Sequence, residues 1–289
     1  MSQWTMRREA LRAILAGARC VQPGSVYDAM SSRMAQHIGF EVGMVGGSSA
    51  SLAVLGAPDL IVMTLTEFAE QCLRMNRSCE LPIMVDADHG YGNALNVMRT
   101  VEELDTAGVA GLSIEDTDLP PAFGTGSRAQ LLTKEEGVGK MLAAVSARRD
   151  SSLVIAARTS AISISDMDDT IARVSAYADT GVDAIFLVGI KTRQQLDMVS
   201  QHIKLPIILG SGGGELDDLN YLAARGVRMC LQGHHPIRAA VQATYATLKA
   251  LRNGTPPQDL QGMPSKELMD IATRNADYRR WQSEYLEHH

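Results

Sequence analysis

The chain has 289 residues, of which 45% are hydrophobic, 21% charged and 4% aromatic, and its formal net charge is −6. This composition is typical of a globular protein with enough apolar residues for one sizeable core. The acidic balance and the lack of a basic run argue against a nucleic-acid partner, because phosphate binding requires clustered lysine and arginine. The longest apolar stretches fall far short of the roughly 20 residues that a membrane span requires, so no membrane partner is expected.

The four cysteines are scattered and form no C-x-x-C pair, which predicts free thiols in a reducing compartment. The N-terminal stretch carries charges throughout and lacks the apolar centre of a signal peptide. We therefore expect a cytoplasmic protein. The last residues, 286–289, read LEHH and are typical of the remnant of an expression tag, so the two final histidines are left out of any site.

Short apolar runs alternate along the chain with longer segments that have helical spacing. The eight predicted strands are 19–23, 42–46, 82–86, 109–115, 153–158, 184–188, 206–209 and 228–231. The predicted helices are 27–38, 66–78, 95–106, 134–148, 167–179, 192–201, 216–225 and 235–252. Strands that alternate with helices predict an α/β fold with a parallel sheet covered on both faces.

Both a closed barrel and an open doubly wound sheet fit this alternation. Eight repeats within residues 1–253 favour a (β/α)₈ TIM-type barrel, because open sheets of this kind usually have fewer strands. No G-x-G-x-x-G motif follows the first predicted strand, which disfavours a dinucleotide-binding fold. We therefore predict one barrel catalytic domain over residues 1–253.

Residues 254–285 depart from the repeating pattern. Glycine and proline break the periodicity first, and a final helix is predicted over 265–285 with apolar and aromatic residues such as Leu268, Tyr278 and Trp281. A helix with such a surface must pack on something. We expect this C-terminal helical arm to make an oligomer contact, with packing on its own barrel as the alternative.

Acidic residues end two neighbouring strands of the predicted barrel, at the end where active sites of this fold lie. Asp86 and Asp88 follow the third strand, and Glu115 and Asp116 follow the fourth. Such carboxylates repel one another unless a hard cation joins them, and an all-oxygen set suits Mg²⁺ or Mn²⁺ rather than Zn²⁺. Because Mg²⁺ retains water, we expect one direct carboxylate ligand and others that act through water. The alternative is a D-x-D turn whose aspartates cap helices.

Arg158 ends the fifth predicted strand, and its guanidinium fork suits a carboxylate. One interpretation is that it binds the carboxylate of a ligand. The other is a structural ion pair with Glu115 or Asp116. Its position beside the acidic strand ends favours the metal site over a simple turn motif.

Three further strand ends carry weaker signals. After the second strand, Gly46 and Gly47 let backbone N–H groups approach a ligand oxygen, and Ser48 adds a hydroxyl. After the eighth, we expect one of His234 and His235 to face the pocket while the other caps or packs. The glycine-rich GSGGGE after the seventh strand resembles a phosphate-binding loop, or simply gives clearance above the metal.

The motif DADHGYGN at 86–93, followed by SIEDT at 113–117, resembles the phosphoenolpyruvate mutase/isocitrate lyase superfamily. The resemblance extends over about residues 10–250. Supporting matches are GGSSAS at 46–51, EEGVGK at 135–140, AART at 156–159 and GHH at 233–235.

This resemblance implies a set of ligand roles. Asp86 would bind Mg²⁺, with Mn²⁺ possible, and Asp88 and Glu115 would hold its waters. The substrate would be a small 2-oxo acid that chelates the metal through its C1 carboxylate and C2 oxygen. Ser48 and the neighbouring backbone amides, with Arg158, would grip that carboxylate.

The loop at 120–128 indicates which branch of the superfamily the chain resembles. It contains no cysteine, whereas the carbon–carbon lyases carry K-[KR]-C-G-H there, and no asparagine, which the phosphonate-forming mutases use. The remaining resemblance is to the oxaloacetate decarboxylase family, which shares DADHGYGN, a Phe-Gly loop and a Gly-His pair. GSGGGE departs from the aromatic turn of that family and leaves substrate specificity open.

The implied activity is that of a carboxy-lyase, which decarboxylates oxaloacetate to pyruvate and CO₂ through a metal-stabilised enolate. The catalytic residues would be Asp86, Arg158 and His234, with the histidine orienting the C3–C4 end of the substrate. Alternatives are hydrolysis of oxaloacetate to oxalate and acetate, or another lyase for 2-oxo or 2-hydroxy diacids. A phosphate-binding barrel isomerase or aldolase and a non-catalytic scaffold are further alternatives. The superfamily's trailing helix is exchanged within a dimer of dimers, which implies a homotetramer.

Overall fold

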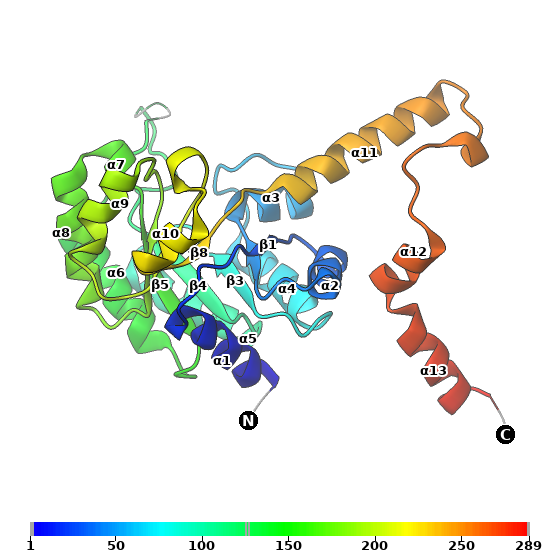
Figure 1. Ribbon diagram of the computed structural model, residues 1–289, viewed down its shortest axis with the longest axis horizontal. Coiled ribbons are helices and arrows are strands. Elements are labelled where there is room, and N and C mark those ends of the chain that lie inside the picture. The colour runs from blue at the N-terminus through cyan, green and yellow to red at the C-terminus, as the bar shows by residue number, and fades with distance from the viewer. Residues whose placement is uncertain (1–2, 125, 127, 288–289) are drawn as a thin grey trace.

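A computed structural model describes residues 3–124, 126 and 128–287 of the protein. Its sheet has eight parallel strands, each paired with the next along the chain, and helices surround it (Figure 1). The sheet closes through Val21, which precedes the first strand: its N–H donates to the Arg228 carbonyl at 2.9 Å and its carbonyl accepts from the Cys230 N–H at 3.0 Å, in the last strand. The predicted (β/α)₈ barrel is confirmed.

The strands agree with the apolar runs of the sequence, except for the first. They are β1 Gly24–Ser25, β2 Gly43–Val45, β3 Ile83–Asp86, β4 Gly111–Glu115, β5 Val154–Thr159, β6 Ala184–Leu187, β7 Ile207–Leu209 and β8 Val227–Cys230. The prediction of a first strand over 19–23 was wrong, because that segment contributes only a single bridge, from Val21 to Met229. Pro23 has no N–H to donate, so the ladder resumes only after it.

Thirteen α-helices occur among the described residues. They are α1 Gln3–Ala16, α2 Ala29–Ile38, α3 Gly47–Leu55, α4 Leu65–Asn76, α5 Ala94–Thr106, α6 Lys134–Ala147, α7 Ala161–Ile164, α8 Met167–Ala178, α9 Arg193–Ser200, α10 Leu219–Ala224, α11 His235–Arg252, α12 Lys266–Thr273 and α13 Asn275–Tyr285. Short 3₁₀ turns are η1 Gly214–Leu216 and η2 Pro257–Asp259. Helices α1, α3 and α7 are absent from the predicted set. None of the helices in the described part of the chain combines the length and apolar character needed to cross a bilayer.

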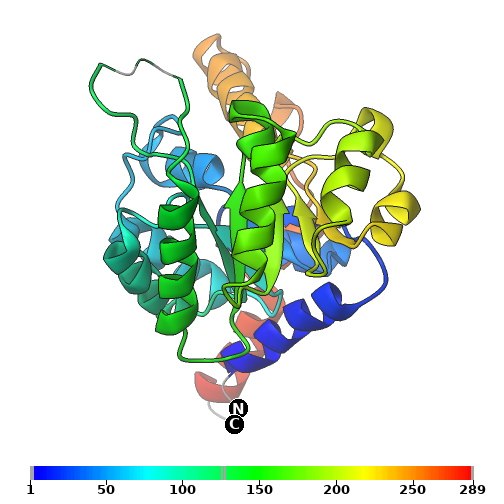
Figure 2. The ribbon, with the colours of Figure 1, turned by 90° about the vertical axis from the view of Figure 1, so that its left-hand side faces the viewer.

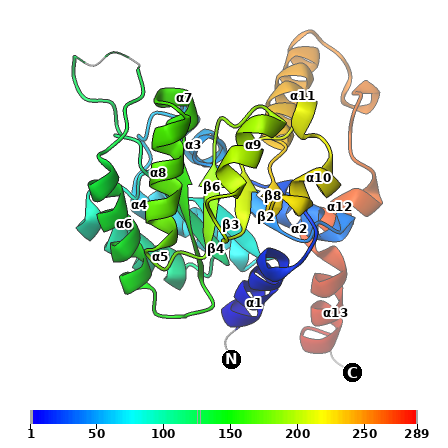
Figure 3. The same cartoon turned by 60° about the vertical axis from the view of Figure 1, so that its left-hand side comes forward.

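The hydrophobic core has two layers because the strands are buried on both faces. Outward-facing strand residues such as Ile83 and Leu112 pack against the surrounding helices. Inward-facing residues such as Met84 and Phe186 fill the barrel together with Leu11 of α1. Helix α1 therefore closes one end of the barrel, below the strands (Figure 3).

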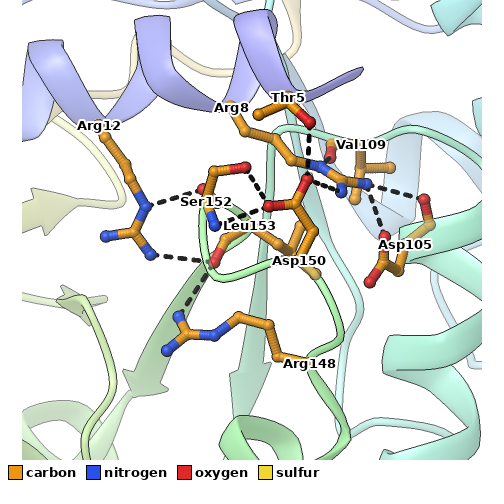
Figure 4. A network of polar contacts seen from close by, with 9 residues as sticks. All are labelled: Thr5, Arg8, Arg12, Asp105, Val109, Arg148, Asp150, Ser152 and Leu153. Carbon is orange, nitrogen blue, oxygen red and sulfur yellow. Dashed lines mark hydrogen bonds and ion pairs between the residues drawn. The ribbon is translucent and has the colours of Figure 1, made fainter. Parts of the chain in front are cut away.

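Arginines of α1 hold this helix against the amino-terminal ends of the strands (Figure 4). Arg8 donates to the Val109 carbonyl at 3.0 Å and to Asp150 Oδ2 at 2.8 Å. Arg12 donates to the Leu153 carbonyl at 3.2 Å. The long loop between β4 and α6 lies at the opposite end of the barrel (Figure 2), and that end remains accessible to a ligand.

Helix α11 leaves the barrel and extends outward, and the C-terminal arm of residues 254–285 then turns back (Figure 1). Helix α12 packs against α2, and Arg33 Nη1 donates to the Ala272 carbonyl at 2.9 Å. The single helix predicted over 265–285 is in fact two, because Arg274 adopts a left-handed conformation with φ 57° and ends α12. The predicted tag remnant falls partly outside the described residues, which include 286 and 287 but not 288 and 289.

Candidate active site

A cavity of about 270 Å³ lies at the carboxyl ends of the strands. It is lined by every site residue that the sequence predicted, together with Asp59 and side chains from the β4–α6 loop. The predicted residues are Gly46, Gly47, Ser48, Asp86, Asp88, Glu115, Arg158 and His234. The structure thus gathers the ends of β2, β3, β4, β5 and β8 around one space.

The centre of the cavity is an arginine between two carboxylates. Strand register places Asp86 beside Ser113, whose Oγ donates to Asp86 Oδ1 at 3.1 Å, and places Glu115 beside Arg158. Arg158 forms ion pairs with Asp86 and, at 3.3 Å, with Glu115. The ion-pair interpretation of this arginine is therefore realised with Glu115, and Asp86 is a second partner that the sequence did not indicate.

The DADHGYGN loop folds as it does because several positions tolerate unusual backbone angles. Asp88 has φ 48° and Gly90 has φ 77°, in the left-handed region. A side chain on Gly90 would also overlap Val97. Asn93 then caps α5 by accepting from the N–H groups of its first turn. His89 is buried, which lowers its pKa to about 4 and keeps it neutral at neutral pH.

Asp59 is a site residue that the sequence analysis missed. It lies in the loop between α3 and α4 rather than directly after a strand, so a search of strand ends does not find it. Partial desolvation and the charge of Asp86 raise its pKa. In the same loop Ile61 lines the cavity with φ 57°, a strained conformation for a β-branched residue.

The start of α3 forms another wall of the cavity. Gly46 is the N-cap residue, and its N–H donates to Ser49 Oγ at 3.2 Å. The first N–H groups of a helix have no partner within it, and those of Gly47 and Ser48 lie at this end. A side chain on Gly47 would overlap the Asp88 carboxylate. Glycine therefore lets the helix start approach the acidic cluster closely.

The two adjacent histidines have different environments. Gly233 has φ 84° and turns the chain, so that His234 lines the cavity half-buried while His235 begins α11 exposed to solvent. Burial lowers the pKa of His234, which favours the neutral ring. Its Nδ1 lies 2.8 Å from Ser25 Oγ. One histidine faces the pocket, as the sequence indicated.

Asp116 does not join the acidic cluster, although it follows Glu115 directly. Neighbouring residues of an extended chain point to opposite sides. Asp116 is fully buried toward the helices, where it accepts from Tyr177 Oη at 2.7 Å, from Thr159 Oγ1 at 3.0 Å and from Arg173 Nη1 at 3.0 Å. Of the two partners that the ion-pair alternative gave for Arg158, the structure therefore shows Glu115 and not Asp116.

The glycine-rich segment after β7 contributes little to the main cavity, where only its first residue, Gly210, appears among the lining residues that the structure describes. Residues 211–213 line a separate cavity of about 290 Å³ together with Asp217. Within the described part of the chain, no lysine or arginine lines that second cavity. The negative charge of Asp217 would repel a bound anion there. This arrangement disfavours the phosphate-binding interpretation.

Among the described residues, no group of three Asp, Glu, His or Cys side chains forms a ready-made cage for a metal ion. The carboxylates are nevertheless crowded. Burial, followed by the charges of Asp86 and Glu115, raises the pKa of Asp88 above its ordinary range. Burial also raises the pKa of Glu115. These raised pKa values favour protonated acids, because Arg158 alone cannot balance the charge of all the carboxylates in their ionised form.

Comparison with known proteins identifies relatives of similar length. The family model described as phosphoenolpyruvate phosphomutase matches residues 11–252. A protein from Bradyrhizobium sp. (strain ORS 278), named oxaloacetate decarboxylase, is 57% identical over 281 residues, with 97% of each chain covered. One of the same name from Rhodopseudomonas palustris (strain BisB18) is 56% identical, with 98% of each chain covered.

Solved structures agree with this assignment. Oxaloacetate acetylhydrolase in complex with the product oxalate is 26% identical, with a TM-score of 0.84 over 97% of this chain and 98% of that one. Phosphonopyruvate hydrolase, in complex with oxalate and Mg²⁺, is 26% identical, with a TM-score of 0.84 over 97% and 99%. The chain therefore belongs to the phosphoenolpyruvate phosphomutase family, within the phosphoenolpyruvate mutase/isocitrate lyase superfamily that its motifs resemble.

Proposed function

We propose that the protein is a carboxy-lyase that decarboxylates oxaloacetate to pyruvate and CO₂ with the help of a divalent cation. The observation that carries the proposal is one cavity in which a carboxylate cluster, an arginine and a neutral histidine meet. The 57% identity over 97% of the chain to a protein named oxaloacetate decarboxylase supports the same reaction.

A divalent cation fits the acidic cluster of the cavity. Four carboxylates, those of Asp59, Asp86, Asp88 and Glu115, line it with one arginine, Arg158. Their oxygen donors suit Mg²⁺, with Mn²⁺ as the alternative. Asp86 would be the direct ligand, and Asp88 and Glu115 would hold waters around the ion. When bound, the cation would supply Lewis-acid stabilisation of the negative charge that develops on the C2 oxygen.

The chain's own residues bind the two carboxylates of the substrate. Arg158, the Ser48 hydroxyl and the N–H groups that begin α3 bind the C1 carboxylate, because they are positive or hydrogen-bond donor groups of the lining. His234 contacts the C4 carboxylate and orients the C3–C4 bond. When C4 leaves as CO₂, the electron pair of that bond stays on the C2–C3 unit, and a proton added at C3 gives pyruvate.

The loop between β4 and α6 completes the wall and carries none of the side chains that other branches use. A bridge between Thr117 and Leu131 ties its two ends together, and Leu119 and Pro121 line the cavity. Apolar residues there exclude water from the reacting bond. Within the predicted 120–128 loop, positions 125 and 127 lie outside the described residues. The sequence of the loop contains no cysteine, which supports decarboxylation over carbon–carbon lyase chemistry that uses a cysteine acid.

The assembly that we propose is a homotetramer, a dimer of dimers. Helix α11 exposes Val241, Tyr245 and Leu248. These residues border an apolar groove of about 840 Å³ that also includes side chains of α3 and α4. A groove of this kind beside the projecting α11 supports self-association, in addition to the contact predicted for residues 254–285.

The test is product analysis with purified enzyme and Mg²⁺ over a panel of C3 to C6 oxo and hydroxy diacids. Oxaloacetate is expected to be consumed fastest and to give equal amounts of pyruvate and CO₂. The second candidate is hydrolysis, favoured by the structural likeness to oxaloacetate acetylhydrolase at a TM-score of 0.84. Formation of oxalate and acetate in place of pyruvate would replace decarboxylation with that reaction.

A further inference from the structure

Ser25 contacts the cavity histidine across the closure of the barrel. It ends β1, and its Oγ lies 2.8 Å from Nδ1 of His234, which follows β8. The backbone on both sides of Ser25 is fixed, because the Gly24 N–H donates to the Val42 carbonyl at 2.9 Å and the Val26 N–H to the Met44 carbonyl at 3.0 Å. The hydroxyl is therefore held at a defined place on the rigid sheet.

The opposite edge of the histidine ring lies against the start of α3, which lines the cavity. A side chain added to Gly46 would overlap Nε2 of His234, so this nitrogen lies over the glycine backbone that begins α3. With Ser25 on one edge and Gly46 on the other, the ring is held in one orientation. Of the two ring nitrogens, Nε2 is the one beside Gly46, which lines the cavity.

A neutral imidazole carries one hydrogen and one lone pair, and the partner of one nitrogen decides which of them the other presents. Among the described residues, the hydrogen bond of the Ser25 hydroxyl is the one to His234. A hydroxyl that donates to Nδ1 places the ring hydrogen on Nε2. That N–H is then a donor for a substrate carboxylate, whereas the other tautomer would present a lone pair that repels it.

We propose that Ser25 is a positioning residue for decarboxylation: its hydroxyl donates to Nδ1 of His234 and fixes the tautomer whose Nε2–H faces the C4 carboxylate of the substrate. This inference rests on the proposed function. It assigns to β1, the shortest strand of the described barrel, a role in holding the carboxylate that leaves.

The first experiment compares Ser25→Ala with the full-length wild-type enzyme. We expect kcat/KM for oxaloacetate to fall about tenfold, because the loss of one oriented hydrogen bond to a charged group has roughly this effect. Inhibition by oxalate should be unchanged, because oxalate has no C4 carboxylate to reach His234. Ser200→Ala is the matched control, since Ser200 is also half-buried with one hydrogen bond, to the Asp197 carbonyl at 3.2 Å, outside the cavity. An equal kcat/KM in Ser25→Ala and Ser200→Ala would overturn the proposal.

The second experiment asks whether Ser25 acts through His234. In a double-mutant cycle, Ser25→Ala should have no further effect on kcat/KM in the His234→Ala background. Nitrogen NMR of labelled His234 should report the Nε2–H tautomer in the wild type and a mixture in Ser25→Ala. Additive effects, or an Nδ1–H tautomer in the wild type, would contradict the proposal. If wild-type enzyme released no CO₂ from oxaloacetate, the proposed function would fail instead. The tautomer measurement would still test whether the Ser25 hydroxyl donates to Nδ1 of His234.

Discussion

Single glycines decide how closely the parts of the cavity approach one another. A side chain on Gly47 would overlap the carboxylate of Asp88, which itself holds a left-handed backbone conformation. The Asp88 N–H donates to Asp86 Oδ1 at 3.3 Å, so a displacement of Asp88 would also move Asp86, the proposed metal ligand. The positions of the Asp86 and Asp88 carboxylates therefore depend on the absence of a side chain at Gly47.

Gly47→Ala tests this dependence. We expect the affinity for Mg²⁺, measured by calorimetry, to fall at least about tenfold, and decarboxylation to fall with it, because groups around a ligand carboxylate set its position. Gly139→Ala is the control, since a side chain at Gly139 in α6 meets open space. Unchanged Mg²⁺ affinity in Gly47→Ala would show that the cluster tolerates the displacement of Asp88.

Arg158→Ala addresses the binding of the C1 carboxylate. We expect KM for oxaloacetate to rise about 10- to 100-fold with a smaller change in kcat, because the loss of a charged hydrogen bond costs about 1.5 to 3 kcal/mol of binding. Arg225→Ala, which removes an arginine outside the cavity, should leave both constants unchanged. A large fall in kcat at constant KM would mean that Arg158 acts on the transition state rather than on substrate binding.

At the scale of elements, the carboxylate of Asp150 helps to hold α1 against the closed end of the barrel. Burial opposes ionisation of Asp150, but hydrogen bonds from Ser152, Arg8 and Thr5 outweigh it and lower its pKa below the ordinary value of 3.8. A lowered pKa in the folded protein means stabilisation that is present above the unfolded-state pKa and is lost as pH falls through the folded-state value.

Asp150→Asn should therefore lower the free energy of unfolding by about 1 to 3 kcal/mol at neutral pH, the usual cost of losing charged hydrogen bonds. The difference from wild type should shrink as pH falls below about 4, and denaturant unfolding over a pH series measures it. Glu9→Gln, an exposed acid of the same helix, is the control and should show little difference at any pH. A difference that does not vary with pH would refute this account of how α1 is held.

The elements that the sequence predicted correctly are those whose burial imposes a pattern. Seven strands are continuous apolar runs because both of their faces are covered, and the acidic site residues follow directly where such runs end. Helix α3 was missed because Gly46 at its N-cap and Gly47 at its first position resemble a turn. These glycines are present because the helix start approaches Asp88 and His234.

Other features depend on contacts between distant residues and have no local signal. Asp59 reaches the cavity from a loop, and the left-handed Arg274 divides the final helix without a glycine to mark the break. The contact between Ser25 and His234 joins residues 209 positions apart. Such features follow from the closure of the barrel rather than from spacing along the chain.

At the scale of the whole molecule, the projecting α11 leaves apolar side chains exposed in the single chain. Tyr245 and Leu248 are more than half exposed, at 61% and 62%. Leu248→Glu should shift the assembly from tetramer toward smaller species in analytical ultracentrifugation, because a charge in an apolar contact must be desolvated. Gln242→Glu, on the same helix but not in the groove, should leave the mass unchanged. A wild-type enzyme that sediments as a monomer would contradict the proposed assembly.

The most direct test of the whole account is the metal dependence of turnover. Enzyme stripped of divalent ions with a chelator should lose oxaloacetate decarboxylation. Added Mg²⁺ should restore it with saturation in the wild type and in Asp168→Asn, which changes an exposed acid outside the cavity lining. Asp86→Asn should recover less than about a thousandth of that rate at any Mg²⁺ concentration, because it removes the proposed direct ligand. Full turnover in chelator, or normal Mg²⁺ activation of Asp86→Asn, would contradict a cation held by these carboxylates.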